Sequence, residues 1–268
     1  MAVLVVRVET DDIEACSDWL FQLGATAIEE RSTDGELTLV TGFATDDGAL
    51  HARSVLSERW PCRLEGTGDE AEWRDEWLRF IEPIVVAGYV IHAPWHDPAS
   101  WPADAVTISI DPGRAFGSGH HPTTRLTLAA LANRVDRHTT ILDVGCGTGI
   151  LSIAAAKMQA PSVLGIDLNY DIIEVATANI EANGVTSQIT VRTDSISSLD
   201  DSFDVVVANI VIGDLLPLIP ELVMRAERFM IVSGFLDEQA ERVVAAAHAT
   251  VVDRSSLDGW TCLTLAPL

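Results

Sequence analysis

Three glycines and a carboxylate form the group of residues in this sequence that is best suited to chemistry. Gly145, Gly147 and Gly149 alternate along the chain directly after the apolar run Ile141–Val144. Glycine adopts positive φ readily and lets a ligand approach the backbone closely. Asp167 ends the next apolar run, about 20 residues beyond the first glycine, which is the offset expected for an acid that binds ribose hydroxyls. The pattern predicts a nucleoside site.

The elements that would position these residues are a strand, a tight turn and a helix. The apolar run leads into the glycines, and the chain continues as the helical segment Leu151–Lys157. A helix that starts at such a turn directs its free N–H groups at whatever binds there. Strand, glycine turn and helix together form the first unit of an open α/β sheet.

The glycine spacing differs from that of a dinucleotide site. A G-x-G-x-x-G pattern would place its third glycine at position 150, which is Ile150. The alternating glycines after Asp143 instead resemble D-x-G-x-G-x-G, the nucleoside-binding motif of class I S-adenosylmethionine-dependent methyltransferases. A nicotinamide oxidoreductase and a glycine turn used only for packing remain the alternatives.

A second glycine-rich stretch, Asp111–Thr124, precedes this turn and is too polar for a core element. Its glycines would let it fold over a ligand as a lid, and Thr123 or Thr124 is a candidate cap for the helix that follows. Phe116 would either form a wall of the pocket or simply pack. His120 and His121 are adjacent, but no third ligand lies at a useful spacing, so we expect no metal site.

Polar residues also follow two later strands. Asp194 comes just after the predicted strand Gln188–Arg192, and the apolar strand Asp204–Asn209 ends in an amide. Ligands of open α/β sheets bind at the carboxyl ends of the strands. We therefore place Asp194 and Asn209 at the site, with a plain turn role as the alternative for Asn209.

The order of the elements predicts two folded parts joined by a linker. Residues 106–268 alternate between strands and helices, which predicts a doubly wound, Rossmann-like α/β sheet. Residues 1–66 follow the order β-α-β-β-α with a possible last strand near Cys62, which predicts a small ferredoxin-like α+β domain. Residues 67–105 form the linker, whose predicted helix carries Trp73, Trp77 and Phe80 on one face.

The composition restricts partners and location. The chain has 268 residues and a formal net charge of -23, which repels nucleic-acid phosphates and would attract a basic protein, unless it serves only solubility. No apolar run approaches the ~20 residues of a membrane span, and no secretory leader is recognisable. We expect a cytoplasmic protein whose scattered cysteines form neither disulfides nor a zinc site. They are Cys16, Cys62, Cys146 and Cys262.

Four motifs occur in an order that resembles the PrmA family, the methyltransferases of ribosomal protein L11. They are DPGRAFGSGHHPTT, ILDVGCGTGILSIAA, VVVANIVIGDLL and IVSGFLDEQAE. The first is the most specific, since ordinary class I methyltransferases lack it. The resemblance implies an N-terminal substrate-recognition domain, a linker and a catalytic domain that methylates lysine ε-amines and the N-terminal α-amine of the ribosomal protein.

The resemblance also implies roles for particular residues, with Asn209 beside the reacting centre. Together with the residues chosen above, the expected S-adenosylmethionine site comprises Thr124, Gly145, Gly147, Asp167, Asn209, Phe116 and Asp194.

Two departures from the family pattern lie near the expected substrate side. They are the Gly-Ser-Gly-His-His of the first motif and the Ile-Val-Ile-Gly-Asp that follows Asn209. They leave open a related protein-lysine methyltransferase with another substrate. A non-catalytic protein that binds the methyl donor is a further alternative.

Overall fold

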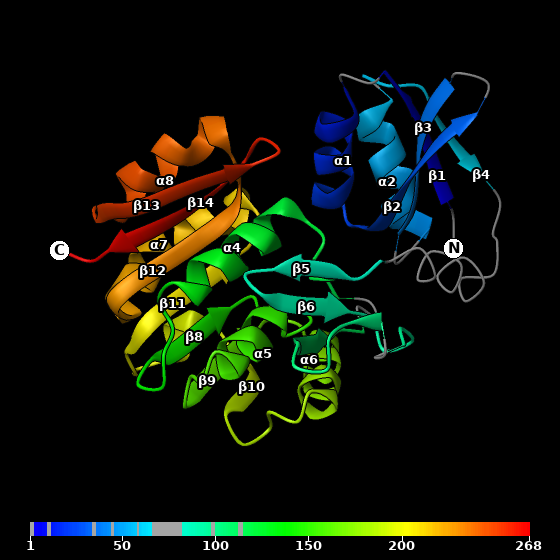
Figure 1. The fold of residues 1–268 in the computed structure, drawn as a ribbon. Coiled ribbons are helices and arrows are strands. Elements are labelled where there is room, and N and C mark those ends of the chain that lie inside the picture. Colours follow the sequence, from blue (N-terminus) through cyan, green and yellow to red (C-terminus); the bar gives the residue numbers. More distant parts are fainter. Residues whose placement is uncertain are drawn as a thin grey trace. The chain divides into compact units, whose positions relative to one another are not determined.

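The structure is a computed structural model whose elements are labelled in Figure 1. It describes residues 3–9, 12–33, 36–43, 46–57, 59–65, 82–97, 100–111 and 115–268. The chain divides into two units, Met1–Ile81 and Glu82–Leu268. The predicted helix with Trp73, Trp77 and Phe80 lies outside the described residues. In the described ranges we find no helix long and apolar enough to cross a lipid bilayer.

A seven-stranded sheet forms the centre of the second unit, with the order β10-β9-β8-β11-β12-β14-β13. The first five strands in this order are parallel, and β14 runs antiparallel to both β12 and β13. The strands are β8 (Thr140–Val144), β9 (Ser162–Asp167), β10 (Ile189–Thr193), β11 (Phe203–Asn209), β12 (Ala226–Leu236), β13 (Thr250–Leu257) and β14 (Trp260–Ala266). The predicted doubly wound α/β class is confirmed.

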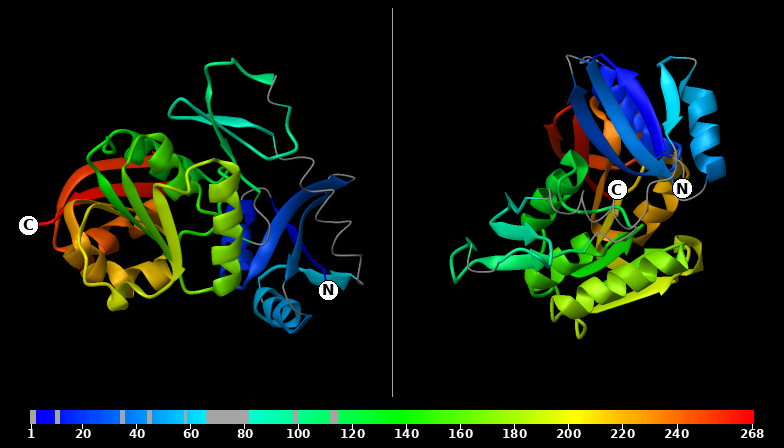
Figure 2. Two further views of the ribbon diagram at one scale, coloured as in Figure 1. Left: turned by 90° about the horizontal axis from the view of Figure 1, so that it is seen from below. Right: turned by 90° about the vertical axis from the view of Figure 1, so that its right-hand side faces the viewer.

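Helices cover both faces of this sheet, as Figure 2 shows. Buried residues on one face join α4 (Pro122–Ala132), α5 (Ile150–Lys157) and α6 (Tyr170–Ala182) in one core cluster. Those on the other face pack with α7 (Ile212–Arg225) and α8 (Ala240–Ala247). A short 3-10 turn, η4 (Asp237–Gln239), precedes α8, and a second, η3 (Ile196–Ser198), follows β10.

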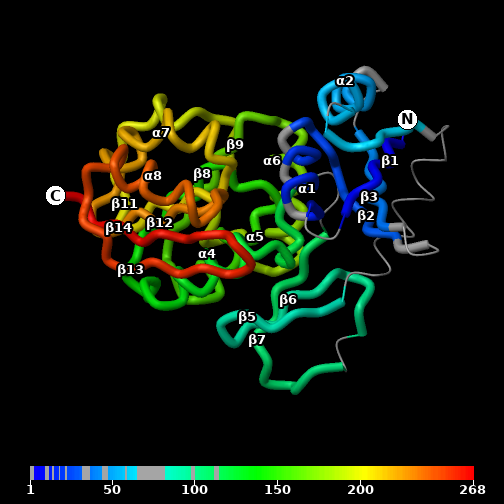
Figure 3. The backbone as a smooth tube through the Cα atoms, turned by 90° about the horizontal axis from the view of Figure 1, so that it is seen from above, coloured from blue at the N-terminus to red at the C-terminus, as the bar shows by residue number. Residues whose placement is uncertain are grey.

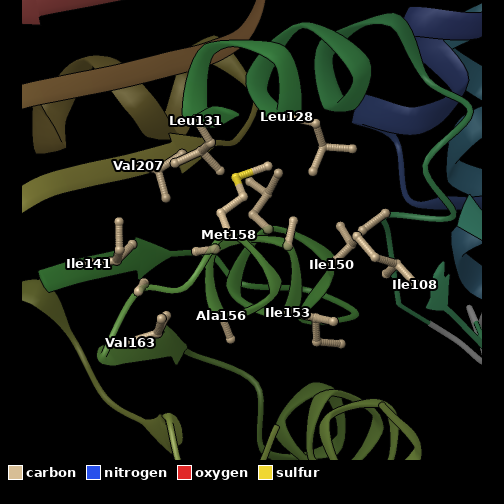
Figure 4. Packing of buried hydrophobic residues seen from close by; sticks show 14 of the residues in the cluster. Ile108, Leu128, Leu131, Ile141, Ile150, Ile153, Ala156, Met158, Val163 and Val207 are labelled. Carbon is tan, nitrogen blue, oxygen red and sulfur yellow. The ribbon is translucent and has the colours of Figure 1, made fainter. Parts of the chain in front are cut away.

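Successive side chains of a strand point to opposite faces of the sheet, so one strand contributes residues to both core clusters. In β8, Ile141 belongs to the first cluster, while Leu142 and Val144 belong to the second. Figure 4 shows Ile141 and Val207 directed from the sheet toward Met158. Full burial of such a side chain contributes about 1.5–3 kcal/mol. The carboxyl ends of the parallel strands are thereby held in register, and it is there that the candidate site residues lie.

A three-stranded sheet precedes α4 in the second unit. It contains β5 (Ile84–Val86), β6 (Tyr89–His92) and β7 (Val106–Ser109), which lie side by side in Figure 3. Ile91 and Ile108 are buried and pack in the same cluster as Ile150 of α5. The division of the sequence at 66 and 105 stays a prediction, although β5 and β6 from the predicted linker pack within this second unit.

The first unit has the element order β-α-β-β-α-β that the sequence predicts. Its four-stranded antiparallel sheet has the order β2-β3-β1-β4. The elements are β1 (Val3–Val8), α1 (Ile13–Gln22), β2 (Ala25–Thr33), β3 (Glu36–Phe43), α2 (Asp46–Leu56) and β4 (Cys62–Glu65). A separate cluster that includes Leu4, Val6, Leu20 and Phe43 forms its core.

Helix α7 is an element that the local sequence pattern does not predict. Pro217 and Pro220 lie inside it, and proline in a helix interior removes a backbone hydrogen bond. Leu215, Ile219 and Leu222 are fully buried along one stripe, so packing against the sheet outweighs this penalty. The helix is also required by topology, because β11 and β12 are parallel neighbours and need a crossover.

Candidate functional site

The glycine turn after β8 allows two other segments to come into backbone contact with it. Gly145 has φ 71° and Gly147 has φ 54°, both in the left-handed region. A Cβ atom on Gly147 would lie 2.5 Å from the carbonyl oxygen of Phe116. A Cβ atom on Gly145 would lie 2.5 Å from Cγ2 of Ile210. Only glycine meets both the conformational and the spatial requirement at these two positions.

The turn is tied to the end of β9, where Asp167 lies. The N–H groups of Gly145 and Cys146 donate to the carbonyl oxygen of Ile166 at 2.9 and 3.0 Å. The N–H of Gly147 donates to Oδ2 of Asp167 at 3.3 Å, and the N–H of Asn169 donates to Oδ1 at 3.1 Å. The structure therefore brings the predicted acid to the predicted glycine turn, with its carboxylate partly exposed.

Asp143 is buried beneath the glycine turn and binds the helix that follows it, a role that the motif alone does not show. Its Oδ2 accepts hydrogen bonds from the N–H and the Oγ of Ser152 at 3.1 and 2.7 Å, which ties β8 to α5. Its Oδ1 is buried without a hydrogen-bond partner in the described part of the chain. Burial raises the pKa of Asp143 from 3.8 to about 6, and the nearby charge of Asp167 adds to this.

Asn209 at the end of β11 contacts Thr124 of α4, which is buried. Its Nδ2 donates to Oγ1 of Thr124 at 3.2 Å. Its Oδ1 is buried, and none of the described residues donates a hydrogen bond to it. A buried unpaired carbonyl oxygen costs about 1–3 kcal/mol and becomes satisfied when a ligand offers an N–H group. The two predicted residues thus form one unit with a free acceptor.

The stretch predicted as a lid is attached to the glycine turn through its backbone. The N–H of Thr148 donates to the carbonyl oxygen of Phe116 at 3.1 Å, and its Oγ1 donates to that of Gly117 at 2.8 Å. The Phe116 side chain is half exposed and meets the His121 ring edge-on, with 5.5 Å between centroids. Phe116 therefore lies beside the turn, and its ring does not belong to the core.

The two adjacent histidines of this stretch have different partners. His121 is the N-cap of α4, and its Nδ1 accepts from the N–H of Thr123 at 3.3 Å. Burial lowers the pKa of His121 to about 4, so the ring is neutral at pH 7. Nε2 of His120 lies 2.7 Å from the carbonyl oxygen of Glu82. Among the described residues, no group of three metal-ligating side chains is found.

Asp194 lies next to Asp167 but its carboxylate has local partners. Its N–H donates to the carbonyl oxygen of Asp167 at 3.1 Å. Oδ1 accepts hydrogen bonds from the N–H of Ser195, at 3.1 Å, and from the Oγ of Ser198. Oδ2 lies 3.3 Å from the guanidinium of Arg192. The residue is thus at the edge of the site, with its side chain turned into its own loop.

Ile210 is a site residue that the sequence analysis does not single out. A Cβ atom on Gly234, at the end of β12, would lie 2.0 Å from the carbonyl oxygen of Ile210. The Ile210 side chain lies against Gly145 on the other side. Gly145 in the turn after β8 and Gly234 in β12 therefore leave the space that the segment directly after Asn209 occupies. The Ser233-Gly234 pair in the motif IVSGFLDEQAE was the available signal in the sequence.

The fold and the site together define a class I methyltransferase. The parallel strands end in a glycine turn, an acid on the neighbouring strand and an amide on the opposite neighbour, and the sheet closes with an antiparallel strand pair. The chain matches the family model "Ribosomal protein L11 methyltransferase (PrmA)" over residues 2–267. The chain belongs to this family.

Individual relatives agree with this family. A ribosomal protein L11 methyltransferase of Ralstonia pickettii is 32% identical over 292 residues, covering 97% of this chain and 96% of the relative. The one of Myxococcus xanthus is 33% identical over 282 residues, covering 98% and 97%. The crystal structure of ribosomal protein L11 methylase from Lactobacillus delbrueckii subsp. bulgaricus gives a TM-score of 0.61 at 32% identity, over 67% of this chain and 95% of that one.

The raised pKa of Asp143 predicts a particular pH dependence of stability. The folded state binds this proton more tightly than the unfolded chain, so the stabilisation is complete below pH 3.8 and is lost as the pH rises through about 6. In Asp143→Asn this loss, about 3 kcal/mol at most, should disappear. Urea unfolding between pH 4 and 8 measures it.

The matched control for this experiment is Asp200→Asn, which changes an exposed aspartate. This variant should keep the pH slope of the wild-type protein. An Asp143→Asn protein whose unfolding free energy follows the same pH slope as the wild type would contradict the raised pKa.

Proposed function

We propose that the protein transfers methyl groups from S-adenosylmethionine to ribosomal protein L11, at lysine ε-amines, at the N-terminal α-amine, or at both. The family and the names of the relatives support the reaction and the substrate. The observation that carries the proposal is the unpaired, buried Oδ1 of Asn209. Asn209 is the last residue of β11, beside the glycine turn, and an amine substrate would need a hydrogen-bond acceptor there.

The residues present fit the methyl donor, which supplies a methyl group on a sulfonium. Gly145 and Gly147 have positive φ, a conformation in which a tight turn can present its backbone to a nucleoside. The partly exposed carboxylate of Asp167 can accept hydrogen bonds from ribose hydroxyls. The residues that would hold the donor are Thr124, Gly145, Gly147, Asp167, Asn209 and Phe116. Asp194, whose side chain is engaged in its own loop, would lie at the edge of this site.

Transfer to nitrogen requires a neutral amine, because an ammonium has no lone pair. A lysine side chain has a pKa of ~10.4 and an α-amine one of ~7.7–8.0. Burial and a neighbouring positive charge both lower these values, so the site needs no strong general base. It needs acceptors that orient the N–H bonds of the amine, and much of the rate then comes from alignment.

In this mechanism Asn209 supplies such an acceptor. Its Nδ2 is engaged by Thr124, so the amide plane is fixed and Oδ1 is the atom left for the substrate. Phe116, half exposed beside the turn, would exclude water from one side. His121 is neutral and engaged as a helix cap, so we assign it no proton-transfer step.

The partner that we propose is a basic ribosomal protein. The net charge of -23 would attract such a partner and would repel the phosphates of nucleic acid. We therefore propose neither direct nucleic-acid binding nor membrane association. The reaction would take place in the cytoplasm, where ribosomal proteins are made.

A related protein-lysine methyltransferase with a different substrate is the second candidate. The segment after Asn209 enters α7 with the exposed residues Val211 and Asp214, in a stretch where a small residue, glycine and proline are commoner in the family pattern. Mass spectrometry of purified L11 incubated with the protein and S-adenosylmethionine separates the two. Added methyl groups on L11 support the first proposal. Methylation of another protein in cell extract, with L11 unchanged, supports the second.

Replacement of Asp167 tests the donor site. Asp167→Ala should weaken binding of S-adenosylhomocysteine by a few kcal/mol, since it removes charge-assisted hydrogen bonds to ribose. Isothermal titration calorimetry measures this. Asp171→Ala, which removes an exposed carboxylate in the first turn of α6, is the control and should bind as the wild type does. Unchanged affinity in Asp167→Ala would remove this residue from the site.

Replacement of Asn209 separates catalysis from binding. Asn209→Ala should lower kcat about 10²-fold through misalignment of the amine, with a smaller change in donor affinity. Stability should change little, because loss of the Nδ2 hydrogen bond to Thr124 is offset by removal of the unpaired, buried Oδ1. Steady-state kinetics and thermal unfolding test both, with the exposed Asn133→Ala as control. Wild-type kcat in Asn209→Ala would refute its catalytic role.

A further inference from the structure

Asn179 of α6 joins two backbone segments that are far apart in the sequence. The residue is 3% exposed. Its Oδ1 accepts a hydrogen bond from the N–H of Asp111 at 2.9 Å. Its Nδ2 donates to the carbonyl oxygens of Asp111 and Thr148, both at 3.0 Å. One side-chain amide therefore binds the chain after β7 and the glycine turn after β8 at the same time.

Thr148 connects this amide to the stretch that carries Phe116. Its carbonyl oxygen faces Asn179, while its N–H and Oγ1 donate to the carbonyl oxygens of Phe116 and Gly117. A Cβ atom on Gly117 would lie 2.7 Å from Oγ1 of Thr148, so this approach leaves no free space. Asp111 is thus linked to Thr148 through the side chain of Asn179, and Phe116 is linked to Thr148 by a direct hydrogen bond.

We propose that Asn179 is a positioning residue for the methyl donor. It sets the positions of Asp111 and, through Thr148, of Phe116 relative to the glycine turn, and it is not itself assigned a contact with the donor. This inference rests on the proposed function, because the positions of Asp111 and Phe116 matter only if the methyl donor binds at the glycine turn. The glycine turn and the Phe116 backbone are then already held against each other before the donor binds, which favours affinity.

The chemistry of the amide explains why asparagine occupies this position. The three backbone groups are one donor and two acceptors, and a primary amide offers the complementary acceptor and two donors. An aspartate would place oxygen atoms against two carbonyl oxygens in a buried site. An alanine would leave the N–H of Asp111 and the carbonyl oxygen of Thr148 without this partner.

The same helix provides a matched control in Asn183, one turn further on. Its Oδ1 accepts from the N–H of Ser109 at 2.9 Å, and its Nδ2 donates to the Ser109 carbonyl oxygen at 2.7 Å. Nδ2 also lies 2.8 Å from the carbonyl oxygen of Asn179. Asn183 therefore binds the end of β7 in the same way as Asn179 binds Asp111, and none of these bonds reaches the glycine turn.

The experiment compares Asn179→Ala with Asn183→Ala in the full chain. S-adenosylhomocysteine binding is measured by calorimetry, stability by thermal unfolding, and donor KM and kcat by steady-state kinetics. We expect a rise of about tenfold in Kd and donor KM for Asn179→Ala, and less than about a twofold change for Asn183→Ala at comparable loss of stability. A purely structural role would reduce kcat through the folded fraction and leave KM unchanged.

Equal Kd values for the two variants would overturn the inference. If the wild-type protein itself does not bind S-adenosylhomocysteine, the proposed function fails, which is a different result. Should Asn179→Ala not fold, Thr148→Val removes the bond to Gly117 with little change in shape and should raise Kd, while Thr148→Ser should keep it. A wild-type Kd in Thr148→Val would equally refute the positioning of this stretch through Thr148.

Discussion

The close approach of three backbone segments at the end of β8 is the constraint on which the site depends. Gly145 and Gly147 leave room there for Ile210 and for the carbonyl group of Phe116. A single added methyl group at either glycine would force atoms to within 2.5 Å of each other. The segment after Asn209 and the stretch around Phe116 therefore take their positions from the absence of side chains in the turn.

Two buried oxygen atoms without hydrogen-bond partners in the described structure lower the stability of the folded state. Oδ1 of Asp143 and Oδ1 of Asn209 are both without hydrogen-bond partners in the described ranges, and both lie at the carboxyl ends of central strands. Folding would favour apolar residues at these positions. Under the proposed function, the unpaired oxygen atom of Asn209 is the acceptor for the amine.

Much of the fold follows from local patterns. Apolar runs predict the central strands because those strands are buried on both faces, as Val205 and Val206 of β11 are. Helix α7 is not predicted, since Pro217 and Pro220 contradict a helix locally and only packing on the sheet compensates for them. The sequence offers His120 and His121 no third ligand at a useful spacing, but only the fold shows that the two side chains have separate partners.

The sequence by itself determined the glycine turn, the acid at the end of the next strand and the amide at the end of β11, because each follows from a spacing within one β-α unit. Only the tertiary structure decided that Asn209 binds Thr124, that Ile210 lies between Gly145 and Gly234, and that Asn179 joins Asp111 to Thr148. These contacts link residues from different units of the fold. Their partners are chosen by the packing of strands and helices, which no local pattern specifies.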